Sequence, residues 1–391
     1  MAITDKKTGP WGLDQVYNKI NQGSIWSYSD PDNLFAWGNN PTGGLGQNNT
    51  TNYSSPIQLP GTTNVWASLA MGDGAGSGVN ISAIKTNGTL WSWGSNTYGQ
   101  LGQNNKTQYS SPVQIPGTTW SLVSIGNKTS IATKTDGTLW TWGDNGYGQL
   151  GTNQAWAQIK AASSPVQIPG TSWSRPSPNI FWNVYAVRTN GTLWAWGRGG
   201  SGRMAQNIEG DGQDRSSPTQ IPGTSWSRVC AVGGACLAIR TNGTLWAWGG
   251  NNAGQLGQNT PTYYSSPIQI PGTNWSDVRA GDQTVIALKT DGTLYSWGAG
   301  NSGILGTSSI AEVKSPVQIP GTTWSKIRVG SNLAVALKTD GTLWSWGNGY
   351  NGGTGQNLDE SAGRFSSPVQ IGTDTTWTDI SISGTTAYAV N

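Results

Sequence analysis

A seven-residue phrase that recurs along the chain constrains the fold more than any other feature. Copies of Gly-Thr-Leu-Trp-x-Trp-Gly, exact or varied, place Trp-Gly steps at intervals of 56, 49, 54, 52, 49 and 49 residues: Trp37, Trp93, Trp142, Trp196, Trp248, Trp297 and Trp346. A second phrase, Ser-Ser-Pro-x-Gln-Ile-Pro-Gly-Thr-x-Trp-Ser, recurs in step with it, with tryptophans at Trp66, Trp120, Trp173, Trp226, Trp275, Trp324 and Trp377. Self-similarity of this period indicates a repeat architecture. Seven copies of each phrase predict seven units.

Each unit is predicted to form four short β-strands. Asp291-Gly292 is a typical two-residue hairpin turn, because glycine accepts the positive φ that such turns require. Prolines bound the last strand of the unit, which suits an edge position. In the unit that opens at Trp275, the expected strands are 275–280, 285–290, 293–297 and 315–320. Four antiparallel strands in each of seven units predict an all-β, seven-bladed β-propeller.

The two ends of the chain are predicted to share one blade. Residues 377–382 and 386–390 begin a seventh set of strands, and residues 33–38 would supply the strand that this set lacks. Such a closure removes free sheet edges, and it replaces the capping units that an open repeat array needs. The sequence therefore predicts two parts, a propeller over 31–391 and an N-terminal attachment segment over 1–30.

The repeated residues resemble the regulator-of-chromosome-condensation repeat family of propellers over about 33–391. Residues 136–151 carry nearly the whole signature, Asp-Gly-Thr-Leu-Trp-Ser-Trp-Gly-x-Asn-x-x-Gly-Gln-Leu-Gly, with threonine at 141. The resemblance implies the propeller fold. Eukaryotic members usually carry a histidine just after the first turn glycine, where this chain has residues such as Lys128 and Gln283. That departure argues against an exchange-factor or chromatin role, and a shared fold alone does not transfer function.

Composition excludes several classes of function. The chain has no histidine, which rules out Ser-His-Asp and Cys-His catalysis and histidine-bound zinc. Its two cysteines support neither a disulfide framework nor a four-cysteine zinc site, so we expect no metal and no cofactor. A scattered net charge of +3 does not indicate a nucleic-acid surface. No apolar run is long enough to span a membrane, and no apolar stretch follows Lys6-Lys7 as in a signal peptide.

The sulfur and indole side chains are mostly expected in the core. Nineteen of the 23 tryptophans occupy repeat positions, where the faces of neighbouring blades pack together; the others are Trp11, Trp26, Trp156 and Trp182. Cys230 and Cys236 lie on consecutive predicted strands. We expect them to be small buried residues, with a strained cross-strand disulfide or a reactive thiol as the alternatives.

The N-terminal attachment segment is predicted to bind a partner. Its apolar residues follow the spacing of one helical face, flanked by two tryptophans: Trp11, Leu13, Val16, Tyr17, Ile20 and Trp26. So short a helix cannot form a core of its own, and it must bury this face elsewhere. The phrase over 9–26 resembles segments that open tailed-phage structural and tail-fibre proteins.

Insertions after the third strand of several units are the second candidate site. Equivalent loops of a propeller emerge on one side, and insertions on one face often mark the binding face. Neutral variation of solvated loops is the alternative. The predicted loop residues are Trp156, Lys160, Arg203, Glu209, Asp211, Arg215, Asp359 and Arg364.

These features together favour a non-enzymatic structural protein of a tailed-bacteriophage virion, assembled in the host cytoplasm. It would be displayed for host attachment or for decoration of the capsid, neck or tail. Its expected partners are other virion proteins, through residues 1–30, and a host surface glycan or protein; homo-oligomers are compatible with the sequence. A cytosolic protein-binding propeller, acting as an inhibitor or scaffold, is the main alternative. A glycan depolymerase, which would need paired carboxylates such as Asp359 and Glu360, is the other.

Overall fold

The computed structural model describes most of the chain beyond the N-terminal attachment segment. The described residues are 35–38, 40–51, 53–59, 66–72, 79–126, 128–154, 160–178, 182–208, 213–348, 354–356, 364–383 and 386–390. Their regular structure is β-strand, apart from two single 3-10 turns, η1 (Gly200–Gly202) and η2 (Asn301–Gly303). The prediction of an all-β chain is therefore confirmed.

Six four-stranded antiparallel sheets form within the described residues, and we number them blades 1 to 6 in chain order. Blade 1 consists of β3 (Trp66–Met71), β4 (Asn80–Lys85), β5 (Leu90–Gly94) and β6 (Tyr109–Ile115). Blade 2 consists of β7 (Trp120–Ile125), β8 (Thr129–Lys134), β9 (Leu139–Asp144) and β10 (Ala161–Ile168). Blade 3 consists of β11 (Trp173–Pro178), β12 (Asn183–Arg188), β13 (Leu193–Gly197) and β14 (Arg215–Gln220).

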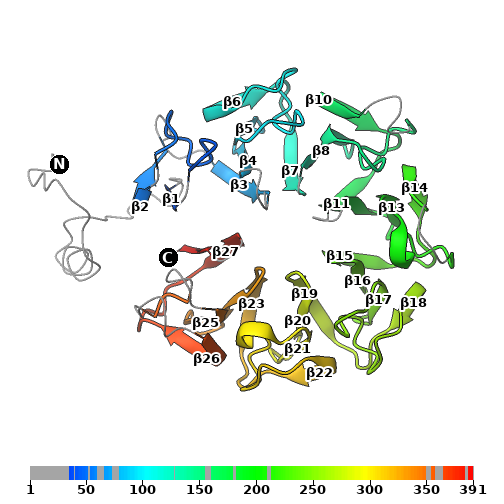
Figure 1. Cartoon of the computed structure of the whole chain (residues 1–391), viewed down its shortest axis with the longest axis vertical. Helices are drawn as coiled ribbons and strands as arrows, with labels where there is room; N and C mark the ends of the chain where they lie inside the picture. Colours follow the sequence, from blue (N-terminus) through cyan, green and yellow to red (C-terminus); the bar gives the residue numbers. More distant parts are fainter. Residues whose placement is uncertain are drawn as a thin grey trace, which may run out of the picture.

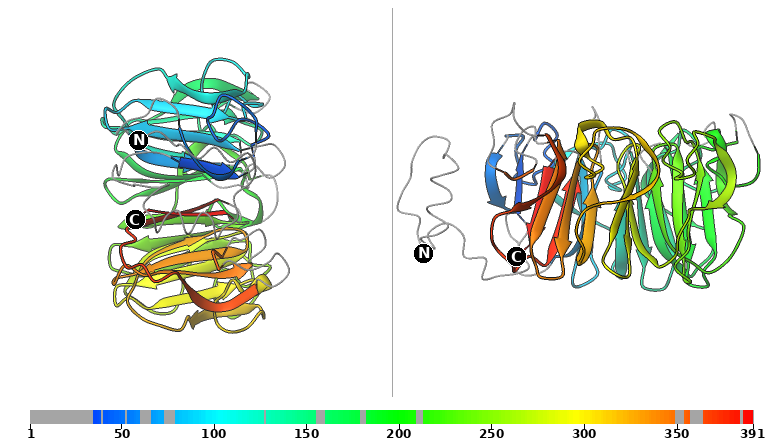
Figure 2. Two further views of the ribbon diagram at one scale, coloured as in Figure 1. Left: turned by 90° about the vertical axis from the view of Figure 1, so that its left-hand side faces the viewer. Right: turned by 90° about the horizontal axis from the view of Figure 1, so that it is seen from below.

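Blades 4 to 6 repeat the same order. Blade 4 consists of β15 (Trp226–Val232), β16 (Ala235–Arg240), β17 (Leu245–Gly249) and β18 (Tyr264–Gln269). Blade 5 consists of β19 (Trp275–Ala280), β20 (Thr284–Lys289), β21 (Leu294–Gly298) and β22 (Val313–Gln318). Blade 6 consists of β23 (Trp324–Val329), β24 (Leu333–Lys338), β25 (Leu343–Asn348) and β26 (Arg364–Ile371). The blades stand around a ring, with the first strand of each blade innermost and the fourth outermost (Figure 1). Their strands run from one face of the disc to the other (Figure 2).

The chain ends form two two-stranded sheets, in the remaining sector of the ring (Figure 1). β27 (Asp379–Ser383) and β28 (Thr386–Val390) supply the first two strands of a blade, and β1 (Phe35–Gly38) and β2 (Tyr53–Gln58) supply the last two. This division of strands is the predicted one. Among the described residues, however, no ladder joins β28 to β1. Leu69 of β3 faces this seam and is 42% exposed, whereas the equivalent Val123 of blade 2 is 6% exposed.

Local turn chemistry explains the hairpins between second and third strands. Gly137 has φ +78° in the Asp-Gly turn of blade 2, and the Thr138 amide donates a 2.9 Å hydrogen bond to Asp136 Oδ1. Three blades use aspartate at this position, which we call the hairpin aspartates: Asp136, Asp291 and Asp340. The other three use asparagine in the same hydrogen bond: Asn87, Asn190 and Asn242.

Tryptophans on the third strands join each blade to the preceding one. Trp346 is fully buried, and its Nε1 donates a 2.8 Å hydrogen bond to the Ile304 carbonyl of blade 5. Gly306, with φ +68°, makes room for the indole, because a Cβ there would lie 2.8 Å from Trp346 Nε1. The glycine that ends the Gly-Gln-Leu-Gly phrase, which reads Gly-Ile-Leu-Gly at 303–306, therefore admits the tryptophan of the next blade. The prediction that the repeat tryptophans are core residues is confirmed for the second tryptophan of the third strands, whereas the first, such as Trp344, is half-buried.

Candidate functional site

Each of blades 1 to 6 has a β-bulge just after the tryptophan that opens its first strand. In β19, Trp275 pairs with Lys289 and Asp277 pairs with Leu288, so Ser276 is the extra residue. A bulge re-aims the side chains that follow it. Trp275 and Val278 are both buried on one face of the strand, and the residues at 277 and 279 lie on the other. We call the second and fourth residues after each of these tryptophans the axial positions.

Charged residues occupy axial positions on five of the seven first strands. In β3 and β7 these positions hold the uncharged residues Ser68, Ala70, Leu122 and Ser124. From β11 to β27 three of the ten positions are also uncharged: Ser177, Cys230 and Ser381. The other seven hold five cations and two carboxylates, and we call these seven residues the axial cluster: Arg175, Arg228, Asp277, Arg279, Lys326, Arg328 and Asp379. The formal charge of the cluster, +3, equals that of the whole chain. One group of residues on neighbouring inner strands therefore carries a net charge equal to that of the whole chain.

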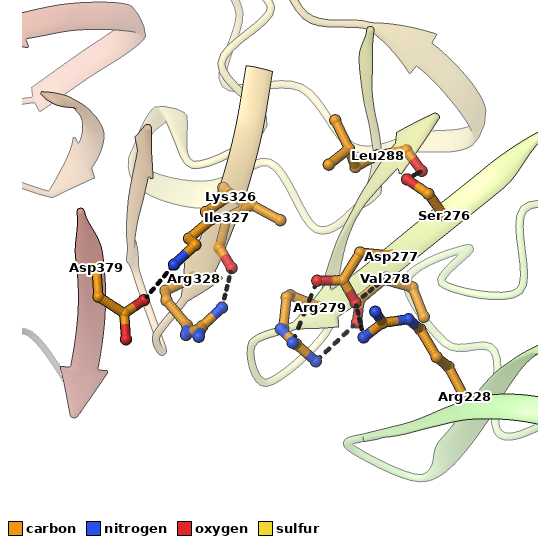
Figure 3. A network of polar contacts seen from close by, with 10 residues as sticks. All are labelled: Arg228, Ser276, Asp277, Val278, Arg279, Leu288, Lys326, Ile327, Arg328 and Asp379. Atoms are coloured by element: carbon orange, nitrogen blue, oxygen red, sulfur yellow. Dashed lines mark hydrogen bonds and ion pairs between the residues drawn. The ribbon is translucent and has the colours of Figure 1, made fainter. Parts of the chain in front are cut away.

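Asp277 joins two blades at the centre of the cluster. Its carboxylate lies 3.4 Å from Arg228 Nη1, on the preceding inner strand, and 3.1 Å from Arg279 Nη2. The Val278 amide also donates a 3.0 Å hydrogen bond to Asp277 Oδ1 (Figure 3). The side chain of Asp277 is only 16% exposed. This carboxylate therefore already has three donors, and two arginines share its single negative charge.

A second ion pair joins blade 6 to the C-terminal strands. Lys326 Nζ lies 3.1 Å from Asp379 Oδ1 (Figure 3). It also donates a 2.8 Å hydrogen bond to the Thr378 carbonyl. Both side chains are well exposed, and a surface pair of this kind contributes about 0–1 kcal/mol to stability. The pair therefore neutralises one cation of the cluster without holding the ring closed.

Arg328 has no carboxylate partner within 4 Å in the described part of the chain. It is half-buried, and its Nη1 donates a 3.0 Å hydrogen bond to the Ile327 carbonyl. Burial lowers the pKa of Arg328, and the charge of Arg279 lowers it further, while Asp379 and Asp277 oppose the change. An arginine keeps its charge at neutral pH. The side of the cluster nearest β23 therefore carries uncompensated positive charge.

A separate set of cations has a repeated packing role. In blade 2, Lys134 Nζ lies 4.8 Å from the ring centre of Trp120 and 4.5 Å from that of Trp140. Trp140 Nε1 donates a 2.9 Å hydrogen bond to Thr138 Oγ1 beside the hairpin turn. The same stack recurs in all six blades, with cations Lys85, Lys134, Arg188, Arg240, Lys289 and Lys338. These six cations therefore have a structural role in the packing of each repeat.

Four of the loop residues predicted from the insertions lie in the described part of the chain: Lys160, Arg203, Arg215 and Arg364. Arg215 opens β14 and Arg364 opens β26, outermost strands on opposite sides of the ring (Figure 1). Lys160, just before β10, is exposed, and its carbonyl accepts a hydrogen bond from the Asn145 amide. Trp156, Glu209, Asp211 and Asp359 lie outside the described residues, as do all the candidates of the N-terminal attachment segment: Trp11, Leu13, Val16, Tyr17, Ile20 and Trp26.

Arg203 was predicted to lie on the loop surface, but the structure shows that it is buried. The residue is only 8% exposed, and its Nε donates a 3.2 Å hydrogen bond to the Gly234 carbonyl. The Arg203 carbonyl accepts a 2.9 Å hydrogen bond from Trp248 Nε1, just as the Gln149 carbonyl accepts one from Trp196 Nε1 in the preceding blade. Arg203 therefore takes the place of the glutamine of the Gly-Gln-Leu-Gly phrase, and this position faces the next blade.

Trp182, one of the four tryptophans outside the repeat, packs against the preceding blade. Its ring centre lies 5.3 Å from that of Tyr147, and the guanidinium of Arg198 lies 5.4 Å from the Trp182 ring. Its φ of +65° is unusual for a bulky residue. Lys128 and Tyr98 make the corresponding contact one blade earlier, with Lys128 Nζ 4.4 Å from the Tyr98 ring centre. These contacts between loops strengthen the junctions of blades 1, 2 and 3.

The two cysteines are free thiols. Cys230 pairs with Leu237 across β15 and β16, and Cys236 pairs with Ala231. Adjacent pairs of an antiparallel ladder point to opposite faces, so the two sulfurs belong to different core clusters. Burial raises the pKa of the Cys230 thiol to about 11 and raises that of Cys236 well above its ordinary value. The expectation of a buried small residue is confirmed for Cys236, whereas Cys230 is half-buried and packs against the core between blades 4 and 5.

The axial cluster was missed at the sequence level, although its signal was present. Half of the fourteen axial positions are charged, whereas only 10% of all residues are. The signal becomes visible only when the variable residues inside the repeat are compared, rather than the insertions outside it. Among the described residues, no group of three or more Cys, Asp or Glu side chains is arranged to hold a metal ion.

Comparison with known families decides the class of repeat. Residues 87–133, 136–175, 242–288 and 291–337 match the regulator of chromosome condensation (RCC1) repeat, and a second description of the same repeat matches 120–149, 275–304 and 324–352. Together the matches cover just over half of the chain. The chain belongs to the RCC1 repeat family. The resemblance drawn from the sequence is thereby confirmed for the repeat.

Two solved structures show the same RCC1-type ring. Prp20p from Saccharomyces cerevisiae is similar with a TM-score of 0.73 and 20% identity, over 91% of this chain and 90% of that chain. Human WBSCR16 is similar with a TM-score of 0.73 and 22% identity, over 89% of this chain and 97% of that chain. Likeness at this level of identity establishes the fold alone.

Curated relatives match this RCC1-repeat chain only locally. The human E3 ubiquitin-protein ligase HERC2 is 35% identical over 78 residues, which are 19% of this chain and 2% of that protein. The zebrafish (Danio rerio) protein RCC2 homolog is 36% identical over 81 residues, which are 19% of this chain and 15% of that protein. The chain therefore spans a small share of the length of these relatives. In the described residues, no helix is long and apolar enough to cross a membrane.

Proposed function

We propose that this chain is a non-enzymatic protein-binding module, and that the axial cluster forms part of its binding surface. One observation carries the proposal. The glycines, tryptophans and stacked cations of the repeat have structural partners in blades 1 to 6, whereas the charges of the axial cluster vary from blade to blade and are absent from the axial positions of β3 and β7. Residues that vary within a fixed scaffold are the ones free to determine what the scaffold binds.

Relatives of the fold give this proposal a precedent. Prp20p has been described together with its binding to Gsp1p and histones, and yeast RCC1 (Prp20) has been crystallised bound to Kap60. Those partners belong to those proteins. What supports binding by this chain is its own uneven charge, because complementary charge steers association and selects partners.

The proposal is tested by affinity capture with the full chain. We compare wild type with the triple variant Arg228→Gln, Arg279→Gln and Arg328→Gln, and with Lys314→Gln as a control on the outermost strand β22. A partner should be enriched by wild type and by the control, and lost with the triple variant. Its direct binding is then measured with purified proteins. Equal binding by all three chains would place the binding surface elsewhere and refute the role of the cluster.

We propose further that this binding serves a tailed-bacteriophage particle, with residues 1–30 attaching the ring to other virion proteins. The support is the phrase at 9–26 and the apolar residues around it, which need a surface to cover them. Mass spectrometry of density-banded particles should find the chain in stoichiometric amounts. A chain lacking 1–30 should be absent from the particles. Detection only as a soluble protein in infected cells would instead favour a cytosolic binding propeller.

A further inference from the structure

We propose that Arg279 and Arg328 form an oxyanion site that takes a carboxylate side chain from an acidic segment of a partner protein. The inference rests on the proposed protein-binding function and names the chemistry of the partner at the same site. It begins from a geometric fact. Both arginines occupy the fourth position after the opening tryptophan, on the neighbouring inner strands β19 and β23. Figure 3 shows the Arg328 guanidinium hydrogen-bonded to the Ile327 carbonyl, and the Arg279 guanidinium bonded to Asp277 and to the Val278 carbonyl, to which its Nη1 donates at 3.5 Å.

The charge balance around the two arginines is incomplete. Arg279 lies 3.1 Å from Asp277, but it shares that carboxylate with Arg228. Lys326 uses Asp379, so neither aspartate of the cluster is left for Arg328. Among the described residues, the hydrogen-bond partner of the Arg328 guanidinium is a backbone carbonyl, that of Ile327. A half-buried arginine without a counter-ion costs stability, and an external anion would remove that cost.

The donors that remain suit a carboxylate. A guanidinium presents its N–H groups in a planar fork that matches the two oxygens of a carboxylate, and such charge-assisted bonds are about twice as strong as neutral ones. The Arg328 fork can donate to one carboxylate, and Arg279 on the adjacent strand adds positive charge beside it. Burial is the main cause of the lowered pKa of Arg328, and the positive charge of Arg279 adds to it.

The pattern of charge favours a polypeptide over a nucleic acid. Binding to a phosphate backbone requires a continuous track of cations. Here Asp277 and Asp379 interrupt the cations, and β3 and β7 are uncharged at the axial positions. A polypeptide can place one carboxylate at the two arginines and continue over the uncharged residues Ser68, Ala70, Leu122 and Ser124. An acidic protein segment is therefore the partner that the cluster fits.

The test uses the full-length chain and a fluorescein-labelled hexaglutamate peptide, with a hexaglutamine peptide as the matched uncharged probe. Fluorescence anisotropy should show that hexaglutamate binds and hexaglutamine does not. Arg328→Gln and Arg279→Gln should each weaken hexaglutamate binding about tenfold or more, as expected for the loss of a charge-assisted hydrogen bond. Lys314→Gln, which removes the same charge at the outer rim, should change binding by less than about twofold.

The variant Arg328→Lys tests the planar donor geometry of the guanidinium separately from its positive charge. This variant keeps the positive charge and loses the planar pair of donors, so its binding should fall between those of wild type and Arg328→Gln. If Arg328→Gln does not fold, as judged by circular dichroism, Arg279→Gln and Arg328→Lys still decide the question.

Several outcomes would overturn the oxyanion site. Losses of equal size in Lys314→Gln and Arg328→Gln would indicate general attraction to a basic protein. Tighter binding of a single-stranded oligonucleotide than of hexaglutamate would assign the cluster to nucleic acid. A captured partner that binds Arg328→Gln and Arg279→Gln as tightly as wild type would refute the oxyanion site and leave the proposed function standing. Specific hexaglutamate binding without any captured partner would support the site and count against the proposed function.

Discussion

The hydrogen bond from Trp346 to the preceding blade should make this indole far more sensitive to substitution than its neighbour Trp344. Trp346 is fully buried and donates 2.8 Å to the Ile304 carbonyl. Trp344 lies two residues earlier, is half-buried, and donates 2.8 Å to Thr342 Oγ1 within its own hairpin. Replacing each with phenylalanine keeps an aromatic ring and removes only the indole N–H and part of the side-chain volume.

The two substitutions should differ in cost. Trp346→Phe deprives a buried carbonyl of its donor, at about 1–3 kcal/mol, and leaves a cavity that adds about 1–2 kcal/mol. Trp344→Phe loses a neutral hydrogen bond near solvent and should cost about 1 kcal/mol or less. The free energy of unfolding should therefore fall by about 2–5 kcal/mol for Trp346→Phe, and at least twice as much as for Trp344→Phe.

Urea unfolding followed by circular dichroism measures the difference. Because repeat proteins can unfold in parts, hydrogen exchange of peptides over 301–306 and 343–348 should be measured as well. Trp346→Phe should speed exchange on both sides of the junction between blades 5 and 6, and Trp344→Phe should affect its own hairpin alone. Equal losses of stability in the two variants would refute the role of the inter-blade hydrogen bond.

Three further results are expected. The pKa of each hairpin aspartate is lowered, first by the hydrogen bond from the following threonine, so these groups lose their contribution as pH falls below about 4. Replacing all three by asparagine should lower stability at pH 7 slightly, because a neutral amide oxygen accepts a weaker hydrogen bond than a carboxylate, and should reduce the further loss in acid; a large loss at pH 7 would contradict this. Because the pKa of Cys230 rises from 9.0 to about 11 on folding, stability should fall as pH rises through this interval, and the native protein should resist iodoacetamide at pH 7.5. Rapid native labelling would refute the burial of the thiol. Val123→Asp should cost about 3 kcal/mol or more and Leu69→Asp less than about 1 kcal/mol, measured by urea unfolding. Similar costs would show that the chain ends close over Leu69.

The repeat made much of the fold predictable. Asp136-Gly137 specifies a hairpin because glycine accepts positive φ and aspartate caps the following threonine, and both effects act within three residues. The tryptophan and glycine phrases recur at a fixed period, so their shared role in packing blade on blade could be inferred before any contact was known. The burial of Cys236 followed from its place on a central strand of the repeat.

The candidate site depended on features that lie outside a local pattern. The bulge after Trp275 moves the following side chains to the opposite face, so counting alternate residues from the tryptophan assigns Asp277 and Arg279 to the wrong side. Arg203 appeared to belong to a variable loop, but its carbonyl receives the indole of the next blade, and the side chain is buried with it. Neither outcome can be read from residues close in sequence.

The sequence by itself determined the repeat, its strands and its turns, because these depend on interactions over a few residues and on a period that the chain displays. Only the tertiary structure decided which charges meet. Arg228, Asp277 and Arg328 lie about one repeat apart along the chain, and the ring places their strands next to one another. Electrostatic energy depends on distance in space, so the axial cluster exists only when the blades are assembled around a common axis.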